Sequence, residues 1–257
     1  MTRAGFLLLL GIPFLLFTAP ASAAMAETEA DSLFREANRA YREGRFEEAA
    51  AGYERIREEG FVSGELFYNL GNAHFQLEDL GRSMANYQRA ARLLPRDADL
   101  RANRNLLEGR ILDRAILRDR LPLIGLLRSG AAAFTTAEWL IAAEFLYGIL
   151  LLLLALPLLH PPLGGPFRAP VRAAGTLLLI VALFTAWSAV EHHGKRRGVI
   201  LPGEVSVRSG PGERFTEEFL LHEGTAVRIQ READGWALVT VSPEWKGWVP
   251  ADSIEPI

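Results

Sequence analysis

Two long apolar runs in the middle of the chain, Trp139–Leu159 and Ala173–Val190, constrain its fold more than any other feature. Each is close to the length at which a helix crosses a bilayer, about 20 residues at a rise of about 1.5 Å per residue. Glu144 is the only charged residue within them. The sequence therefore predicts an integral membrane protein with two transmembrane helices, at 136–159 and 173–190.

The N-terminus is typical of a secretory signal peptide. Arg3 precedes the apolar stretch Gly5–Phe17, which is too short to span a bilayer comfortably. Ala21-Ser22-Ala23 follows as a small-residue cleavage site, so we expect residues 1–23 to be removed. An uncleaved anchor is the alternative, and in both forms the segment that follows is exported.

The topology follows from counting spans. Two further spans return the chain to its starting side, so we expect the segments 24–135 and 191–257 to lie outside the cytoplasm. The connection 160–172 is then a cytoplasmic loop. The cluster Lys195-Arg196-Arg197, just past the second span, opposes the positive-inside rule. We give the signal peptide more weight, because it acts first during synthesis.

The first exported segment, 30–110, contains an internal repeat with a period of 34 residues. Phe34, Ala37 and Tyr53 in the first copy are matched by Tyr68, Gly71 and Tyr87 in the second. A small residue lets two helices approach closely, and a large one fills the space beside it, so each copy is expected to be a helical hairpin. The second copy, with Leu70-Gly71, Tyr87, Ala90 and Pro95, resembles the tetratricopeptide repeat.

The resemblance implies two hairpins closed by one capping helix at Asp97–Leu117, with 111–135 as a juxtamembrane linker. It also implies a shallow peptide-binding groove, lined by Phe34, Asn38, Tyr41, Tyr68, Asn72 and Phe75. Asn38 and Asn72 are one period apart, and in some relatives an asparagine at this position holds the backbone or terminal carboxylate of a peptide. The alternative is that asparagine is simply common at this position of the repeat.

The C-terminal segment 199–257 has alternating apolar residues separated by Gly and Pro turns, which predicts a small antiparallel sheet or barrel. It resembles the bacterial SH3-like domain in the stretch Val205–Gly212, in Gly235-Trp236 and in Gly247-Trp248-Val249. Ser206 stands where that family usually has Asn. The segment contains no tyrosine, so the proline-peptide binding of eukaryotic SH3 domains is not expected.

Three tryptophans of this segment are candidate contacts. Trp236 and Trp248 are expected to pack the barrel, with a ligand platform as the alternative. Trp245, in the turn Pro243–Lys246, is the better candidate for a surface contact.

Glu144 is the one unusual residue of the membrane helices, about 7–8 Å deeper than Trp139 along the helix axis. A carboxylate within a membrane is costly and usually faces protein or water. One expectation is that Glu144 contacts a membrane helix of a partner protein. The alternative is that its carboxylate reaches the lipid headgroups or forms a hydrogen bond with Thr185 or Ser188.

Composition excludes several classes of function. The formal net charge is −3 without a strongly basic stretch, so nucleic acid is not expected as a partner. The absence of cysteine excludes disulfides, thiol nucleophiles and Cys-ligated metals. The five histidines fall in no metal-binding or catalytic motif. We therefore expect no enzyme activity, no cofactor and no metal.

The expected fold is multidomain: tetratricopeptide helical hairpins, a two-helix transmembrane hairpin and a C-terminal SH3-like β-barrel. This order resembles the E protein of the Bacteroides aerotolerance (Bat) family. The resemblance implies a scaffold in the bacterial inner membrane with both soluble modules in the periplasm. Implied partners are membrane-anchored von Willebrand A-domain proteins and a MoxR-type AAA+ ATPase, and the implied role is in envelope stress or aerotolerance. The alternative function is peptidoglycan binding through the SH3-like domain.

Overall fold

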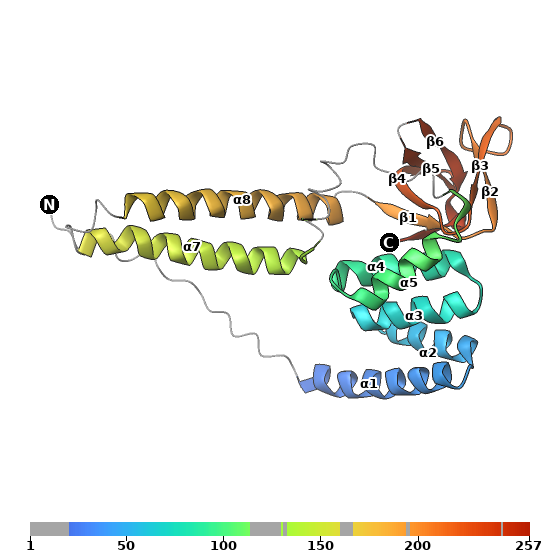
Figure 1. Ribbon diagram of the computed structural model, residues 1–257. Helices are drawn as coiled ribbons and strands as arrows, with labels where there is room; N and C mark the ends of the chain where they lie inside the picture. The colour runs from blue at the N-terminus through green and yellow to red at the C-terminus, as the bar shows by residue number, and fades with distance from the viewer. Residues whose placement is uncertain (1–20, 114–129, 131–132, 160–166, 194–195, 243) are drawn as a thin grey trace.

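The computed structural model describes residues 21–113, 130, 133–159, 167–193, 196–242 and 244–257. This part of the chain forms a stack of short helices, a pair of long helices and an antiparallel sheet (Figure 1). The helical stack and the sheet lie side by side, and the two long helices extend away from them. The expected signal peptide up to residue 20 and most of the expected loop 160–172 lie outside the described residues. So does Leu121–Leu127, an apolar segment of the expected juxtamembrane linker 111–135.

The helical stack consists of consecutive antiparallel helices that each pack on the next. They are α1 (Ala21–Arg42), α2 (Phe46–Glu58), α3 (Gly64–Gln76), α4 (Leu80–Leu93) and α5 (Ala98–Glu108). The side chains of Ser63 and Asp97, which are 34 residues apart, cap α3 and α5 by accepting hydrogen bonds from the backbone N of Leu66 (3.0 Å) and Leu100 (2.7 Å). The repeat period is therefore kept into a third copy, of which α5 is the first helix.

The close helix contact expected at Gly71 is present. A Cβ atom at this position would lie 2.6 Å from Cδ1 of Tyr87, which is 1% exposed. Ser83 donates a hydrogen bond to the carbonyl oxygen of Gly71 at 2.9 Å, so α3 and α4 are also joined through the backbone. In the first copy the corresponding approach joins Ala37 to Gly52, whose added Cβ would lie 3.0 Å from that of Ala37.

The prediction of a capping helix at Asp97–Leu117 is wrong in length, because the helix observed there is shorter. α5 ends at Glu108, and Gly109 caps it. The chain then turns away, which places Ile111 and Asp113 in buried positions against the sheet. Ending the helix at this point is what lets these two side chains reach the sheet.

The long helices α7 (Thr136–Leu159) and α8 (Arg168–His193) are antiparallel neighbours (Figure 1). Thr136 at the start of α7 hydrogen-bonds Ser188 near the end of α8, 3.0 Å between their hydroxyl oxygens. Both helices contain a stretch long and apolar enough to cross a membrane, and almost none of either stretch is buried within the protein. α8 begins five residues before Ala173, inside the expected loop, because Pro170 falls in its first turn, where proline is tolerated.

The start of α7 is a capping box. Thr135 donates its backbone N–H to Oε2 of Glu138 (2.8 Å), and Glu138 donates its own to Oγ1 of Thr135 (3.2 Å). Two backbone donors that a helix start leaves without partners are thereby satisfied.

The C-terminal part is a seven-stranded antiparallel sheet in the order β3-β2-β6-β5-β4-β1-β7. The strands are β1 (Arg197–Ile200), β2 (Glu204–Arg208), β3 (Glu217–His222), β4 (Ala226–Ala233), β5 (Trp236–Ser242), β6 (Trp245–Pro250) and β7 (Ile254–Pro256). Alternate residues such as Val205, Val207, Val227 and Ile229 are buried, as the period of two predicts. Asp234 (φ 52°) and Gly235 (φ 78°) join β4 to β5 in a tight turn with positive φ at both residues.

The helical stack and the sheet share a buried interface that the sequence analysis does not predict. Val199 of β1 belongs to the same apolar cluster as Met84 and Ala90 of α4 and Leu107 of α5. Gly81, near the start of α4, lies so close to the sheet that an added Cβ would be 2.9 Å from the carbonyl oxygen of Ile200. The helical stack and the sheet are therefore one packed body.

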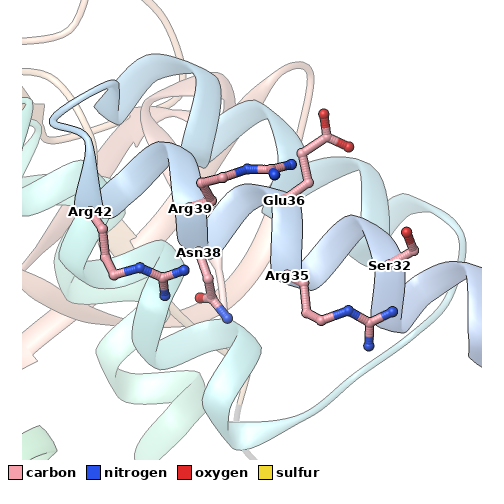
Figure 2. Close-up of a pocket in the computed structure, with 6 residues that line it drawn as sticks. All are labelled: Ser32, Arg35, Glu36, Asn38, Arg39 and Arg42. Carbon is pink, nitrogen blue, oxygen red and sulfur yellow. The ribbon is translucent and has the colours of Figure 1, made fainter.

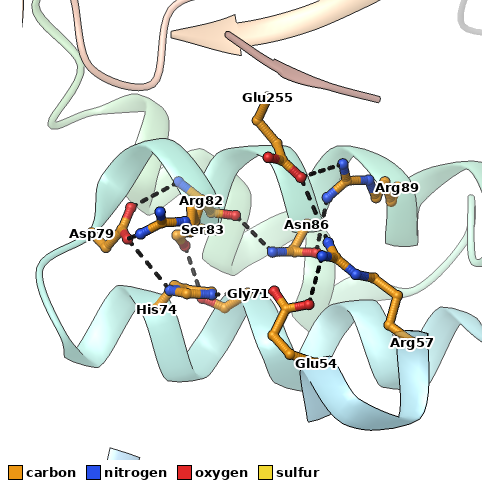
Figure 3. Close-up of polar contacts among 10 residues, drawn as sticks. All are labelled: Glu54, Arg57, Gly71, His74, Asp79, Arg82, Ser83, Asn86, Arg89 and Glu255. Carbon is orange, nitrogen blue, oxygen red and sulfur yellow. Dashed lines mark hydrogen bonds and ion pairs between the residues drawn. The ribbon is translucent and has the colours of Figure 1, made fainter. Parts of the chain in front are cut away.

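Ion pairs between α4 and the last strand extend this interface (Figure 3). Glu255 of β7 accepts a hydrogen bond from Arg89 of α4 at 2.7 Å and lies 3.6 Å from Arg57 of α2. Within the stack, buried His74 lies 3.6 Å from Asp79 and 3.9 Å from Glu54. Burial lowers the pKa of His74, but the two carboxylates outweigh it, so that pKa is raised above its usual value.

Candidate functional site

The first helices of the three repeat copies, α1, α3 and α5, are joined through amide side chains. Asn69 of α3 donates to Oδ1 of Asn38 on α1, and Asn103 of α5 donates to Oδ1 of Asn72 on α3, each at 3.0 Å. We call the surface formed by these helices the inner face. It comprises Phe34, Asn38, Tyr41, Tyr68, Asn72, Phe75 and Asn103.

Each of the two asparagine oxygens also accepts a tyrosine hydroxyl from the second helix of its own copy. Tyr53 donates to Asn38 at 2.6 Å, and Tyr87 donates to Asn72 at 2.7 Å. Burial raises the pKa of Tyr53 to about 12 and also raises the pKa of Tyr87, so both hydroxyls stay protonated and remain donors. The two units repeat with the 34-residue period and fix the orientation of both amides.

The structure brings in two residues that the sequence analysis missed, Asn69 and Asn103. Their signal was present in the sequence, since they are 34 residues apart like Asn38 and Asn72. The expected pair Asn38 and Asn72 is therefore part of a structural network as well as of the inner face. Its oxygens are occupied by the protein itself.

Asn38 still has hydrogen-bonding capacity on its open side. Its Oδ1 is used twice, but among the described residues nothing accepts a hydrogen bond from its Nδ2. This amide lies in a shallow cavity of about 410 Å³ (Figure 2), whose described lining is Ser32, Arg35, Glu36, Asn38, Arg39 and Arg42.

The charge of this cavity favours an anion. Arg35, Asn38 and Arg42 point to the same side of α1, with the amide between the two guanidinium groups (Figure 2). Glu36 is the only acidic residue of the described lining, against three arginines. An amide donor between guanidinium groups is suited to binding a carboxylate.

The aromatic residues expected in the groove are half-buried and partly used in packing. Phe34 packs on Tyr53 with ring centroids 5.7 Å apart, and Tyr68 packs on Tyr87 at 6.2 Å. Tyr41 contacts Phe46 edge-on at 5.3 Å. Arg110 lies over the ring of Phe75, 5.4 Å from its centroid, and its guanidinium is paired with Glu78.

The tryptophans of the sheet differ in burial. Trp248 is buried and has Arg231 over its ring, whereas Trp236 is half-buried. Trp245 is 39% exposed and packs edge-on against Phe219, with ring centroids 4.7 Å apart. Trp245 and Phe219 therefore form an aromatic pair on the surface of the sheet.

Glu144 is exposed on the outside of α7. Thr185, a suggested partner, donates instead to the carbonyl oxygen of Val181 at 2.8 Å, and the hydroxyl of Ser188 bonds Thr136. Glu144 therefore stays a candidate for contact with headgroups or with another membrane helix.

Comparison of the chain with known proteins identifies no relative whose site could be compared with this one. No protein-family model matches the chain, and no curated protein matches it significantly. Among the described residues, no group of three or more His, Cys, Asp or Glu is placed to hold a metal ion.

Proposed function

We propose that the protein is a membrane-anchored scaffold whose inner face binds a carboxylate-bearing segment of a partner protein. The observation that carries this proposal is the position of Asn38. Tyr53 and Asn69 hold its oxygen, and its amide nitrogen lies in a cavity between Arg35 and Arg42. Such a preorganised donor set binds a carboxylate without having to be ordered first.

The family resemblance supplies the wider proposal. The helical stack corresponds to tetratricopeptide repeats and the sheet to a bacterial SH3-like domain, in the order of the Bat E protein. Von Willebrand A-domain proteins of the membrane and a MoxR-type AAA+ ATPase complex are then the proposed partners, in envelope stress or aerotolerance. The 34-residue units of Asn, Tyr and Asn support the repeat assignment.

The shared interface supports one topology. The helical stack precedes α7 and the sheet follows α8, yet the two pack together through α4 and β1. If α7 and α8 cross a membrane, both soluble parts must lie on the same side of it. With the signal peptide, that side is the periplasm of a bacterial inner membrane.

We expect reporter fusions after Arg110 and after Ile257 both to report export, and a fusion near Gly164 to report the cytoplasm. Alkaline phosphatase and green fluorescent protein fusions, each expressed at equal levels, make the measurement. Opposite locations for the two soluble ends would exclude the two-span topology.

The groove is tested by Asn38→Asp. The substituted side chain keeps an oxygen acceptor for Tyr53 and Asn69, so the fold should be retained, but it replaces the outward N–H donors with a second oxygen. We expect recovery of the partner in a membrane pull-down to fall about tenfold or more, because a carboxylate ligand would meet a carboxylate.

Asn105→Asp is the matched control. Asn105 is exposed on α5, two residues past Asn103 and therefore on a different side of that helix. Asn105→Asp adds the same charge to the same domain and should leave recovery of the partner protein unchanged. Equal recovery with Asn38→Asp and with wild type would contradict the groove assignment.

A second candidate function, peptidoglycan binding, is favoured by the exposed pair of Trp245 and Phe219. Aromatic faces of this kind are used to stack on sugars and peptides. Co-sedimentation of Trp245→Ala and wild-type chains with purified sacculi separates this candidate from the scaffold.

A further inference from the structure

Arginines gather where the soluble body meets the ends of α7 and α8. Arg92 lies at the end of α4 and Arg96 in the turn after it. Arg196 precedes β1, and Arg197 begins it. Arg228 lies on β4, where it is the register partner of Arg197. We call this group the membrane-proximal arginine cluster; its members are Arg92, Arg96, Arg196, Arg197 and Arg228.

The cluster is held at one end of the long helices. Arg96 forms an ion pair with Glu138 in the first turn of α7 and donates to the carbonyl oxygen of Ala133 at 3.1 Å. Its guanidinium also lies over the ring of Phe134, 5.1 Å from the centroid. Arg197 follows the last residue of α8, His193, by four positions, a distance of at most about 14 Å of extended chain.

Described carboxylates pair with two members of the cluster. Glu138 pairs with Arg96, and Glu232 pairs with Arg196 at 2.9 Å. The nearby Glu255 is taken by Arg89 and Arg57. Among the described residues no carboxylate pairs with Arg92 or with Arg228.

Arg92 is the most constrained member. It is half-buried between α4 and the sheet. Burial, together with the nearby charges of Arg197 and Arg89, lowers its pKa. The charges of Arg92 and Arg197 repel one another, so an anion that binds both relieves the repulsion.

We propose that the membrane-proximal arginine cluster binds the phosphate groups of anionic phospholipids in the leaflet from which α7 and α8 emerge. This inference rests on the proposed membrane anchoring. Guanidinium groups bind phosphate oxygens in a two-pronged geometry, and anionic lipid surfaces attract basic residues next to a membrane helix. A lipid is favoured over an acidic protein because the cluster adjoins the apolar spans, where lipid headgroups surround it.

The test uses the purified full chain in detergent with added phosphatidylglycerol or phosphatidylcholine, and native mass spectrometry counts the lipids retained. We expect selective retention of phosphatidylglycerol. The double variant Arg92→Gln with Arg197→Gln should weaken it about fivefold for each arginine removed. The corresponding double change to Lys should keep most of it, since the charge is preserved.

Arg82→Gln is the matched control, because Arg82 is exposed on the same helix, about 15 Å from Arg92 along the axis. It should retain phosphatidylglycerol like wild type. Thermal unfolding in phosphatidylcholine checks that each variant is folded, and Arg228→Gln, on the exposed strand surface, provides a second variant if the double change unfolds the chain.

Equal retention of the two lipids by wild type, or undiminished phosphatidylglycerol retention by the folded glutamine variants, would overturn the inference. If the glutamine variants kept their lipids but no longer bound an acidic protein that the wild type binds, the inference would be overturned as well. Extraction of the chain from membranes by alkaline carbonate is measured separately. Release there would refute the membrane anchoring itself, whereas a chain that stays in the membrane but shows no lipid preference refutes only the lipid site.

Discussion

Gly71→Leu is expected to unfold the helical stack locally. The Cβ atom alone would lie 2.6 Å and 2.7 Å from two ring atoms of Tyr87. That ring cannot swing away, because it is buried and its hydroxyl is held by Asn72. We expect a loss of about 3 kcal/mol, the upper end of the usual cost of overpacking. Amide hydrogen exchange in α3 and α4 should then be about 100-fold faster than in the wild type.

The full chain is the correct material for this experiment, since α4 packs on β1 and β7 and a fragment of the helical stack would expose that surface. Gln76→Leu is the matched control, because it adds the same side chain at an exposed position of the same helix. Unchanged exchange in Gly71→Leu, or equal acceleration in the control, would show that the contact between α3 and α4 is not the tight one described.

The elements that the sequence predicted well depend on local or periodic signals. The 34-residue period predicted the helical hairpins and the close contact at Gly71, because each repeat carries the same packing pattern. The apolar runs predicted two long helices, and the first has the bounds 136–159 that the sequence predicted. The alternation of apolar residues predicted the antiparallel sheet.

The candidate site was only partly predictable. Asn38 and Asn72 were identified from their spacing, but the hydrogen bonds that hold their oxygens depend on which helices become neighbours. Asn69 and Asn103 show the same period and escaped notice because no family pattern pointed to them. Only the fold places Arg35 and Arg42 on either side of the Asn38 amide.

The interface between the helical stack and the sheet was not predictable from pattern. Its contacts join residues more than 100 positions apart, such as Asp113 with Thr225 and Gly81 with Glu223. A helical pattern in residues 97–117 is local, so it does not predict contact with a sheet more than 100 positions further along the chain. Contact with the sheet accompanies the end of α5 at Glu108, and Asp113 makes the hydrogen bonds of that contact.

Asp113→Ala is expected to loosen the sheet from the helical stack. The side chain is 7% exposed and accepts three hydrogen bonds: from the backbone N of His222 (2.8 Å), from the Oγ1 of Thr225 (2.7 Å) and from the ring of His222 (3.0 Å). Thr225 is fully buried, so its hydroxyl would be left without a partner. We expect a loss of about 2–4 kcal/mol, since each buried unsatisfied group costs about 1–3 kcal/mol.

The measurement is hydrogen exchange in β3, β4 and α5, compared with exchange in β6, which is bonded to neither β3 nor β4. Asp113→Asn should cost less, because it keeps one oxygen acceptor, and Asp252→Ala, at an exposed position, should cost nothing measurable. A double-mutant cycle of Asp113→Ala with Thr225→Val isolates the pair, and additive effects would contradict a direct hydrogen bond.

Acid should reproduce the effect of Asp113→Ala in the wild type. Burial raises the pKa of Asp113, but the hydrogen bonds from Thr225 and His222 outweigh it and hold that pKa below its usual value. A carboxyl whose pKa is lower in the folded state stabilises that state above its unfolded pKa of about 4, and the contribution disappears as the pH falls through the folded value. Exchange in β3 and β4, after correction for the intrinsic rate, should therefore accelerate as the pH falls below about 4. In Asp113→Ala this acid step should be missing, and its persistence there would assign the step to a group other than Asp113.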